Sequence, residues 1–425
     1  MIRYHAAWVL PIAAPPLRDG WVVVDGGRVV AVGGARHDPA EAGSHRDDRR
    51  ESHTDDRGIR LQPDSDEDLG NVAILPGLVN AHTHLELSYL RDQVPPAGEF
   101  VTWIRRVMAA RRERPDARSP EIFDGIASAI AECERCGTAV VGDISNTLVT
   151  FEPLARSPLA GVVFYELIRF NAPDPRAFVE QATRQLDTLM PTARLRCSLA
   201  AHAPYSVAPA VLRAIRESLA RHPALPASVH LSESAEEVEF IRSASGSWRA
   251  LLEDIGSWDP AFVAPGGTPV EYLDAIGFLD DRVLAVHAVQ ATVADLQRLA
   301  ARGATLVTCP RSNGHTGAGA PPLEEFYASG VRVAVGTDSL ASAPDLNVFA
   351  ELATARALAP TVPAASLLES ATRSGAAALG FAGDYGTIEP GRRARLIAVT
   401  LPDRLDDVEE YLVSGIEPEQ IRWIE

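Results

Sequence analysis

The most informative property of this 425-residue sequence is an absence: it contains no lysine, and all 40 of its basic residues are arginine. Catalysis through a lysine Schiff base, including a pyridoxal linkage, is therefore excluded. A metal bridge built from a modified lysine is excluded for the same reason. If the chain holds a metal, the sequence favours a centre with one ion.

Cysteine, positive net charge and long apolar runs are also scarce. Four cysteines are too few for a disulfide framework in a chain of this size, so we expect a cytoplasmic protein. The formal net charge of −17 argues against nucleic acid or an anionic membrane as a partner, since both attract clustered positive charge. No apolar run approaches the ~18–20 residues of a membrane span, and the N-terminus lacks the pattern of a signal peptide.

Both ends of the chain are rich in β-forming residues. Residues 2–10 are largely apolar, and the later run WVVVDGGRVVAVGG has two β-rich halves joined by Asp-Gly-Gly, the chemistry of a tight hairpin turn. The tail is β-like again from GRRARLIAVT onward. We therefore expect residues 1–75 and 385–425 to form one small β-sandwich domain.

A strongly charged segment interrupts this expected domain. In residues 36–68, 17 of the 33 side chains are charged. Such a run cannot bury enough apolar surface to order itself. We predict a solvated, flexible loop.

Between residues 76 and 384, short apolar runs alternate with amphipathic stretches. The runs are continuously apolar, which indicates burial on both faces, as in a parallel sheet. Eight such units fit an α/β fold of the (β/α)8 TIM-barrel type better than an open doubly wound sheet, and no glycine-rich phosphate loop follows the first run. The predicted strands are 77–82, 138–144, 160–167, 194–201, 226–231, 282–289, 304–310 and 331–337. The predicted helices include 99–114, 120–135, 176–190, 208–221, 292–302 and 364–379.

A barrel of this type places its chemistry at the carboxyl ends of its strands. One residue separates His82 from His84, so in a strand both imidazoles point to the same face. One histidine at a strand end would be unremarkable, but five of the eleven in the chain lie at these ends. The residues gathered there are His82, His84, His202, His230, Glu233, His287 and Asp338.

Three imidazoles and one carboxylate suit a borderline divalent ion, Zn²⁺ or alternatively Fe²⁺. Such a set leaves an open position for a water whose pKa the metal lowers toward ~7. The two remaining groups, His287 and Glu233, suit general acid–base work near neutral pH. The predicted ligands of one ion per chain are His82, His84, His230 and Asp338.

In combination, LPGLVNAHTH, HLSE, the histidine of the sixth strand and GTDS resemble the amidohydrolase superfamily. The tail ALGFAGDYGTIEPGRRARLIAV resembles the same family's return into its small β-domain, although Arg395 stands where the family often has aspartate. NAHTHLELS, AHAPYSV, CPRSN and GTDSLAS are most similar to a branch of the mononuclear deaminases. That branch contains aminodeoxyfutalosine deaminase, of the alternative menaquinone pathway, and its chlorohydrolase-like relatives.

The resemblance implies a hydrolase that acts on C–N bonds of cyclic amidines, with 6-aminodeoxyfutalosine as the favoured substrate. It implies that a metal-bound hydroxide, oriented by His287 and Asp338, attacks the carbon that bears the amino group. Glu233 would protonate the adjacent ring nitrogen, and ammonia would leave. By analogy with the family, further substrate contacts are expected from His202, Glu86, Trp103, Glu166, Arg169, Arg311 and Asn313.

Other functions stay open at this point. The alternative substrates are adenosine, S-adenosylhomocysteine or another N-heterocycle, and a triazine chlorohydrolase needs the same metal chemistry. Glu233 favours an amine leaving group, since a halide has less need of an acid to assist its departure. A catalytically inactive barrel scaffold is the alternative of another class, but no member of the ligand set is missing. A homo-oligomer and a monomer are both open.

A second zinc signature is partly present. The unrelated cytidine-deaminase fold uses His-X-Glu and Pro-Cys-X-X-Cys, and this chain has His84-X-Glu86 and Cys133-X-X-Cys136. However, Glu132 replaces the proline, and the cysteines fall in a predicted helix. That fold would also leave most of the strand-end histidines unused. We therefore expect the cysteines to be structural.

Overall fold

The computed structural model describes residues 1–34, 53–54, 60–61 and 63–424. Most of the charged segment 36–68, with its predicted flexibility, lies outside the described residues. Its last part differs from the prediction of a loop, because β6 (Ser65–Asp68) is an exposed strand that pairs in parallel with β1 (Ile2–Val9). Two short strands, β4 (His53–Thr54) and β5 (Arg60–Leu61), pair with each other.

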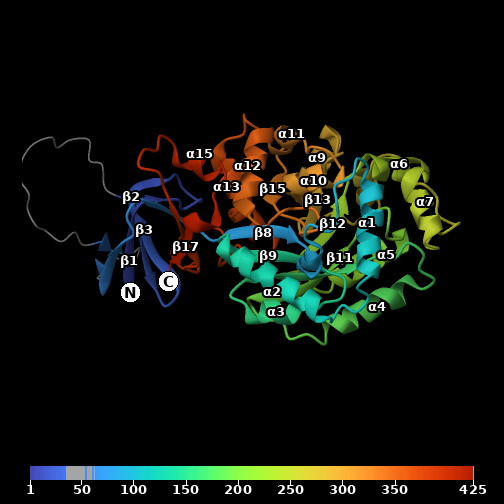
Figure 1. Ribbon diagram of the computed structural model, residues 1–425, viewed down its shortest axis with the longest axis horizontal. Helices are drawn as coiled ribbons and strands as arrows, with labels where there is room; N and C mark the ends of the chain where they lie inside the picture. Colours follow the sequence, from blue (N-terminus) through green and yellow to red (C-terminus); the bar gives the residue numbers. More distant parts are fainter. Residues whose placement is uncertain (35–52, 55–59, 62, 425) are drawn as a thin grey trace, which may run out of the picture.

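Eight parallel strands form a barrel in the centre of Figure 1, arranged in sequence order. They are β8 (Leu78–Thr83), β9 (Thr138–Ser145), β10 (Ala160–Leu167), β11 (Leu195–Ala201), β12 (Ala227–Leu231), β13 (Val283–His287), β14 (Thr305–Thr308) and β15 (Arg332–Val335). Each coincides with a predicted strand to within a few residues. The predicted (β/α)8 barrel is confirmed.

The barrel is nearly closed where its first and last strands meet. Thr83 and Asp338 form a parallel bridge, and the backbone N–H of Asp338 donates to His82 O at 3.0 Å. Gly336 allows this approach, because a Cβ at that position would lie 2.6 Å from His82 O. The closure therefore brings together two segments that carry predicted site residues.

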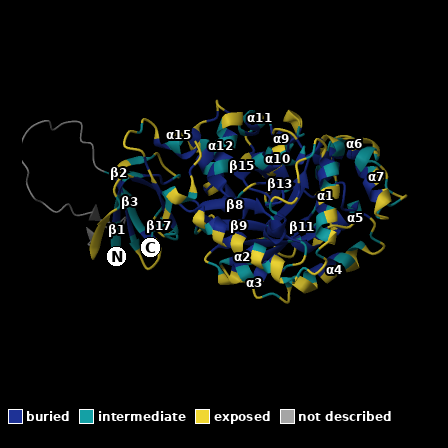
Figure 2. Cartoon of the chain, viewed as in Figure 1, coloured by how far each residue is buried: buried dark blue, intermediate teal, exposed yellow. Residues whose placement is uncertain are grey.

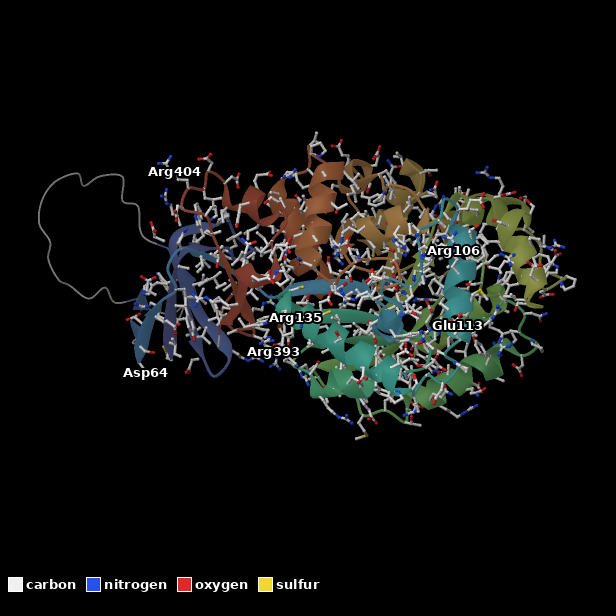
Figure 3. The ribbon with its side chains drawn as sticks, viewed as in Figure 1. Asp64, Arg106, Glu113, Arg135, Arg393 and Arg404 are labelled. Carbon is white, nitrogen blue, oxygen red and sulfur yellow. The ribbon has the colours of Figure 1, made fainter. Side chains whose placement is uncertain are left out.

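Helices surround the barrel, and charged side chains such as Arg106 and Glu113 project from them into solvent (Figure 3). No helix in the described part of the chain is long and apolar enough to cross a membrane. The helices are α1 (Phe100–Arg112), α2 (Pro120–Arg135), α3 (Phe151–Arg156), α4 (Pro175–Leu186), α5 (Pro209–Leu219), α6 (Ala235–Ser243), α7 (Gly246–Asp254), α8 (Pro269–Ala275), α9 (Val293–Arg302), α10 (Pro310–Thr316), α11 (Leu323–Ala328), α12 (Val348–Leu358), α13 (Ala364–Ser370), α14 (Arg373–Ala378) and α15 (Val408–Leu412), with the 3-10 turns η1 (Leu85–Leu90) and η2 (Pro418–Gln420).

Two predicted elements have different limits in the structure. The helix expected over 364–379 is divided into α13 and α14, because Thr372 leaves the helical region (φ −137°, ψ −95°) and its hydroxyl donates to Leu368 O at 2.6 Å. The strand expected over 304–310 ends at Thr308. Pro310 lacks the N–H that a ladder needs and its fixed φ suits the first position of a helix, so it begins α10.

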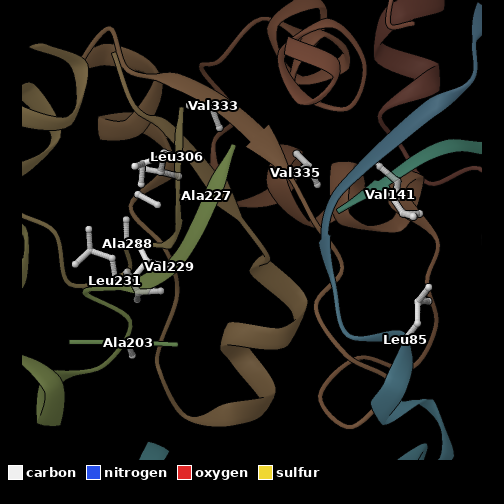
Figure 4. Close-up of a cluster of buried hydrophobic side chains, with 14 of the residues drawn as sticks. Leu85, Val141, Ala203, Ala227, Val229, Leu231, Ala288, Leu306, Val333 and Val335 are labelled. Carbon is white, nitrogen blue, oxygen red and sulfur yellow. The ribbon is translucent and has the colours of Figure 1, made fainter. Parts of the chain in front are cut away.

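The strands are buried on both faces, as their continuous hydrophobicity predicted. Every residue of β8 and of β9 is buried, and Figure 2 shows the barrel strands as the buried interior of a more exposed helical layer. Figure 4 shows part of the core, which includes Val229 of β12, Leu306 of β14 and Val335 of β15. This packing gives the strand ends a rigid base.

Both ends of the chain contribute to a second, mixed sheet at the left of Figure 1. Its order is β17-β16-β7-β1-β2-β3, with β6 on β1. The hairpin between β2 and β3 turns at Gly26 and Gly27, both with positive φ, as predicted. The remaining bounds are β2 (Leu17–Asp25), β3 (Arg28–Gly33), β7 (Val72–Pro76), β16 (Leu396–Thr400) and β17 (Ile421–Ile424).

Arg395, the departure from the family pattern, joins this sheet to the barrel. Its guanidinium lies 3.6 Å from the ring centroid of Trp423 and 3.2 Å from a carboxylate oxygen of Glu134 on α2. The indole of Trp423 donates to Glu134 O at 2.9 Å. The arginine thus takes part in the packing between the sheet and α2.

Candidate active site

The four predicted metal ligands come together at the carboxyl ends of the barrel strands. His82 Nε2 lies 3.2 Å from His84 Nε2, and Asp338 Oδ1 lies 3.4 Å from His84 Nε2 and 3.9 Å from His82 Nε2. The ring of His230 is centred 5.0 Å from that of His82 and 5.5 Å from that of His84. Strands β8 and β12 and the segment after β15 thus supply one compact cluster.

The cluster fits one divalent ion. Ligand atoms bound tetrahedrally at ~2.0–2.2 Å from zinc lie roughly 3.3 Å apart, close to the separations found here. Burial lowers the pKa of His82, and it lowers the pKa of His84 to about 3, so both imidazoles are neutral and have a lone pair to give. His230 Nδ1 donates to the carbonyl of His202 at 2.8 Å, which leaves its Nε2 free for a metal.

Two other groups of donor atoms also lie within 4.8 Å of one another. His82, His230 and His287 share two histidines with this cluster, and the remaining group consists of Glu166, His202 and His230. It does not form an independent site. The Nδ1 of His230 is already committed to the backbone, and its Nε2 belongs to the first cluster. These groups of donor atoms thus form one connected cluster, and one ion per chain stays a prediction.

Glu233 and His287 form a buried pair beside this cluster, with Glu233 Oε1 3.4 Å from His287 Nε2. Burial raises the pKa of Glu233, and the nearby charge of Asp338 adds to the effect. Burial also lowers the pKa of His287 to about 3. Near neutral pH the pair thus offers a carboxyl group that can hold a proton next to an uncharged imidazole.

Three of the turns that present these groups contain a residue in the left-handed region. Ser232 has φ 50°, His287 has φ 76° and Asp338 has φ 59°. Such conformations are strained for residues other than glycine, and they persist only where the surroundings hold them. The hydrogen bonds around the turns are therefore part of the site.

Two residues that the sequence reasoning missed make such bonds. The carboxylate of Glu237 accepts from the backbone N–H of Ser232 at 3.0 Å and from that of Glu233 at 2.8 Å. The hydroxyl of Ser312 donates to Asp338 Oδ2 at 2.6 Å. Glu237 follows the HLSE motif by four residues, and Ser312 lies within the CPRSN segment. That position was the only signal available, since the partners of these side chains are visible only in the fold.

A cavity of about 740 Å³ opens beside the cluster. His84, His230, Glu233, His287 and Asp338 line one part of it. Much of the remaining wall is apolar and comes from α1, α7 and the segment after β10; it includes Phe100, Trp103, Met108, Phe170, Trp248 and Leu251. Three arginines, Arg111, Arg112 and Arg169, also line it, and the last two are exposed to solvent.

The substrate contacts expected by analogy divide into two groups. Trp103, Glu166, Arg169 and His202 line the cavity. Asn313 does not, because its side chain lies 3.0 Å from His287 Nδ1. Nor does the structure bring Glu86 or Arg311 to the cavity wall.

The side chains of Glu86 and Arg311 are occupied elsewhere. Glu86 Oε2 accepts from Ser145 Oγ at 2.6 Å and from the backbone N–H of Thr147 at 3.1 Å, so it organises the segment after β9. Arg311 Nε donates to Glu351 Oε1 at 2.6 Å. Neither guanidinium nor carboxylate is therefore free for a substrate.

The partial cytidine-deaminase signature does not assemble. Cys133 lies in α2 and Cys136 directly after it, both buried, and burial raises the pKa of each thiol, to about 12 for Cys136. Among the described residues, neither belongs to a group able to hold a metal ion. The two cysteines are packing residues.

Comparisons with known proteins agree with this geometry. Residues 73–417 match the model of the amidohydrolase family. The aminodeoxyfutalosine deaminase of Deinococcus radiodurans is 33% identical over 371 residues, covering 83% of this chain and 81% of that protein. A zinc-bound adenosine deaminase structure from Xanthomonas campestris superposes with a TM-score of 0.78 at 28% identity, covering 99% of this chain and 90% of that one. Helicobacter pylori aminofutalosine deaminase with methylthio-coformycin gives 0.80 at 25% identity, covering 100% and 98%.

Proposed function

Because the chain belongs to the amidohydrolase family, we propose that it is a metal-dependent hydrolase that removes the amino group of an aminopurine nucleoside as ammonia. The family resemblance expected from the sequence motifs is thereby confirmed. One observation carries the assignment to deamination. The buried carboxyl of Glu233 lies beside His287 at the edge of the cluster, where it can hold a proton for a ring nitrogen.

The reaction follows from the positions of these groups. A divalent ion, when bound, supplies Lewis acidity that makes water nucleophilic near neutral pH. Glu233 donates a proton to the ring nitrogen next to the amino-bearing carbon, which makes that carbon more electrophilic. Asp338 and His287 orient the attacking water. Asp338 takes up one of its protons and passes it to the departing amino group, and the other proton returns to Glu233 as the C=O bond forms. The proposed ligands are His82, His84, His230 and Asp338.

We propose Zn²⁺ as the ion and 6-aminodeoxyfutalosine, an intermediate of menaquinone biosynthesis, as the substrate, with the reaction in the cytoplasm. Zinc is supported by the donor set and by the zinc in the Xanthomonas campestris relative. The substrate is supported by the Deinococcus radiodurans relative and by the Helicobacter pylori structure.

The charges of the cavity support the same substrate. 6-Aminodeoxyfutalosine is an adenine nucleoside whose sugar carries an apolar chain that ends in a carboxyphenyl group. The apolar wall suits the aromatic ring, and the three lining arginines suit its carboxylate. S-adenosylhomocysteine also carries an ammonium group. Three acidic residues line the cavity, and all of them lie beside the histidines: Glu166, Glu233 and Asp338. Among the described residues, the apolar part of the wall therefore has no carboxylate that could pair with the ammonium group of S-adenosylhomocysteine.

The test is a substrate panel with zinc-reconstituted protein. Ammonia and chloride are measured with aminodeoxyfutalosine, adenosine, S-adenosylhomocysteine, guanine, cytosine and a chlorotriazine. We expect ammonia from aminodeoxyfutalosine. Glu233→Gln should lower kcat by at least ~100-fold, the usual contribution of a positioned acid, while the exposed Glu152→Gln control should retain wild-type kcat.

Each outcome identifies one alternative. Ammonia from another nucleoside would keep the chemistry and exclude the proposed substrate. Chloride from the triazine would indicate a chlorohydrolase. If neither ammonia nor chloride is released and one ion is tightly bound per chain, the substrate lies outside the panel. If no product is released and no metal is bound, the protein is a scaffold.

A further inference from the structure

We propose that α10 is a positioning element of the active site and acts through its consecutive residues Ser312 and Asn313. These two side chains hold the carboxylate of Asp338 and the imidazole of His287 at a fixed separation. Arg311, the residue before them, anchors the helix. The inference rests on the proposed function, in which Asp338 and His287 act together on the water.

The contacts of α10 reach both groups. Ser312 Oγ donates to Asp338 Oδ2 at 2.6 Å, and the amide nitrogen of Asn313 lies 3.0 Å from His287 Nδ1. Ser312 and Asn313 are themselves fully buried, and neither lines the cavity. They therefore do not reach the substrate, and any effect on the reaction passes through their partners.

Both partners need such support. His287 is the last residue of β13, Asp338 lies three residues after the end of β15, and both have positive φ. Such conformations persist only where the surroundings hold them. His287 Nε2 must face Glu233, and Asp338 Oδ1 must face the histidines of the cluster. A bond to the opposite atom of each side chain, Nδ1 and Oδ2, fixes the ring and carboxylate planes without blocking the reactive atoms.

The helix cannot keep its own position, because seven residues are too few for a stable isolated helix. Arg311 supplies the attachment. Its Nε donates to Glu351 Oε1 at 2.6 Å, its backbone N–H donates to Glu351 Oε2 at 3.1 Å, and its guanidinium lies 2.8 Å from Asp345 Oδ1. Glu351 is fully buried on α12, so a rigid neighbouring helix holds α10.

This network also explains the place of Arg311 in the CPRSN segment. The sequence suggested a substrate contact, but the side chain points to α12 and is only 13% exposed. Because the Glu351 carboxylate accepts from both the side chain and the backbone N–H of Arg311, it fixes the orientation of the arginine as well as its distance. Arg311 is thus a positioning residue that touches neither the substrate nor the two groups it serves.

The experiment compares six variants of the full-length, zinc-loaded protein: Ser312→Ala, Ser312→Thr, Asn313→Ala, the double alanine variant, Arg311→Met, and the triple variant that combines Arg311→Met with the double variant. Arg216→Met is the matched control, since Arg216 is also largely buried and lies 2.5 Å from the carboxylate of Asp280, away from the cavity. Removing a residue that orients a metal ligand typically costs ~10–100-fold in activity. We expect each single variant except Ser312→Thr to lose ~10-fold or more in kcat, with KM within ~3-fold of wild type and one zinc retained per chain.

The specific prediction concerns Arg311→Met. It should reproduce the kcat of the double variant, and adding it to the double variant should cost little more, because all three changes release the same two groups. Ser312→Thr, which keeps the hydroxyl, should restore most of the activity lost in Ser312→Ala. Arg216→Met should keep wild-type kcat at a similar loss of melting temperature.

Three results would overturn the proposal. Arg311→Met could match Arg216→Met in kcat, the losses could appear in KM alone, or they could disappear when activity is divided by bound zinc. If the wild type turns over no nucleoside, the proposed function fails first, and crystal structures decide the positioning separately. In that case, Asp338 and His287 must shift in Arg311→Met, and unchanged side chains would exclude the role of α10.

Discussion

At the scale of single residues, buried carboxyl groups do two different kinds of work in this protein. Glu233 faces the cavity, and burial raises its pKa, which suits its proposed role as a proton donor. Glu237, four residues later, faces the backbone of the turn that carries Glu233 and Ser232. Burial raises the pKa of both carboxyl groups. In Glu233 the raised pKa suits the proposed proton transfer, and in Glu237 it makes the stability of the fold depend on pH.

Burial raises the pKa of Glu237 to about 8, against roughly 4.5 in an unfolded chain. Because its pKa is higher in the folded state, the protonated carboxyl of Glu237 contributes to the free energy of unfolding. This contribution is fully present below pH ~4.5 and is lost as the pH rises through about 8. Between pH 5 and 8 the wild type should lose up to ~1.4 kcal/mol of unfolding free energy per pH unit relative to Glu237→Gln, which cannot ionise there. Urea denaturation at four pH values measures the difference.

The exposed Glu152→Gln variant is the control for this measurement and should follow the wild type at every pH. A Glu237→Gln variant that also follows the wild type would show that Glu237 does not titrate in this range.

A site residue could be predicted from the sequence where it follows directly on a predicted strand. His82, His230 and Asp338 follow buried apolar runs, so their common rim could be inferred from the barrel alone. Arg311 could not be placed, because its partner Glu351 lies 40 residues later on another helix. The role of Glu86 could not be predicted either, because its partners follow a strand some 60 residues later in the chain.

At the scale of elements, predicted strands agree well with the structure because continuous burial leaves a strong signal. Helix limits depend on single side chains, as the hydroxyl of Thr372 shows where it ends one helix and begins the next. The segment after β14 shows the limit of sequence reasoning. Pro310 ends the strand early, so Arg311 and Asn313, two of the expected substrate contacts, lie in α10, the proposed positioning element.

Helices α8 and α9 are joined through their caps, which gives a prediction at this scale. Thr292 caps α9, where its Oγ1 accepts from the backbone N–H of Asp295, and the carboxylate of Asp295 also accepts from Thr268, the cap of α8. Thr292→Ala should lower the unfolding free energy by about 1 kcal/mol, the usual value of such a cap. Thr292→Ser should lose far less, and denaturant midpoints of the two variants measure the contrast. Equal losses would show that the methyl group, rather than the cap, matters.

At the scale of the whole molecule, the proposed metal ligands come from parts of the chain that only the complete barrel unites. An ion bound to the folded state alone stabilises it by about 4 kcal/mol when its free concentration is 1,000 times its dissociation constant. Chelation should therefore lower the melting temperature markedly. His230→Ala should abolish the difference between zinc-loaded and chelated protein, whereas the exposed His222→Ala should preserve it.

Calorimetry of the two variants with and without chelator decides this point. If chelation leaves the wild-type transition unchanged, the four ligands do not form a metal site that matters for folding.

The bridge between Thr83 and Asp338 also sets an order in time. During synthesis, His82 and His84 of the proposed ligand set leave the ribosome more than 250 residues before Asp338, which completes it. The terminal sheet waits longer still, since β7 pairs with β16 near the end of the chain. A nascent chain therefore carries an incomplete cage for most of its synthesis. If the proposed residues hold the ion, metal loading follows closure of the barrel, and a chain released before that point would lack both the closure and the complete ligand set.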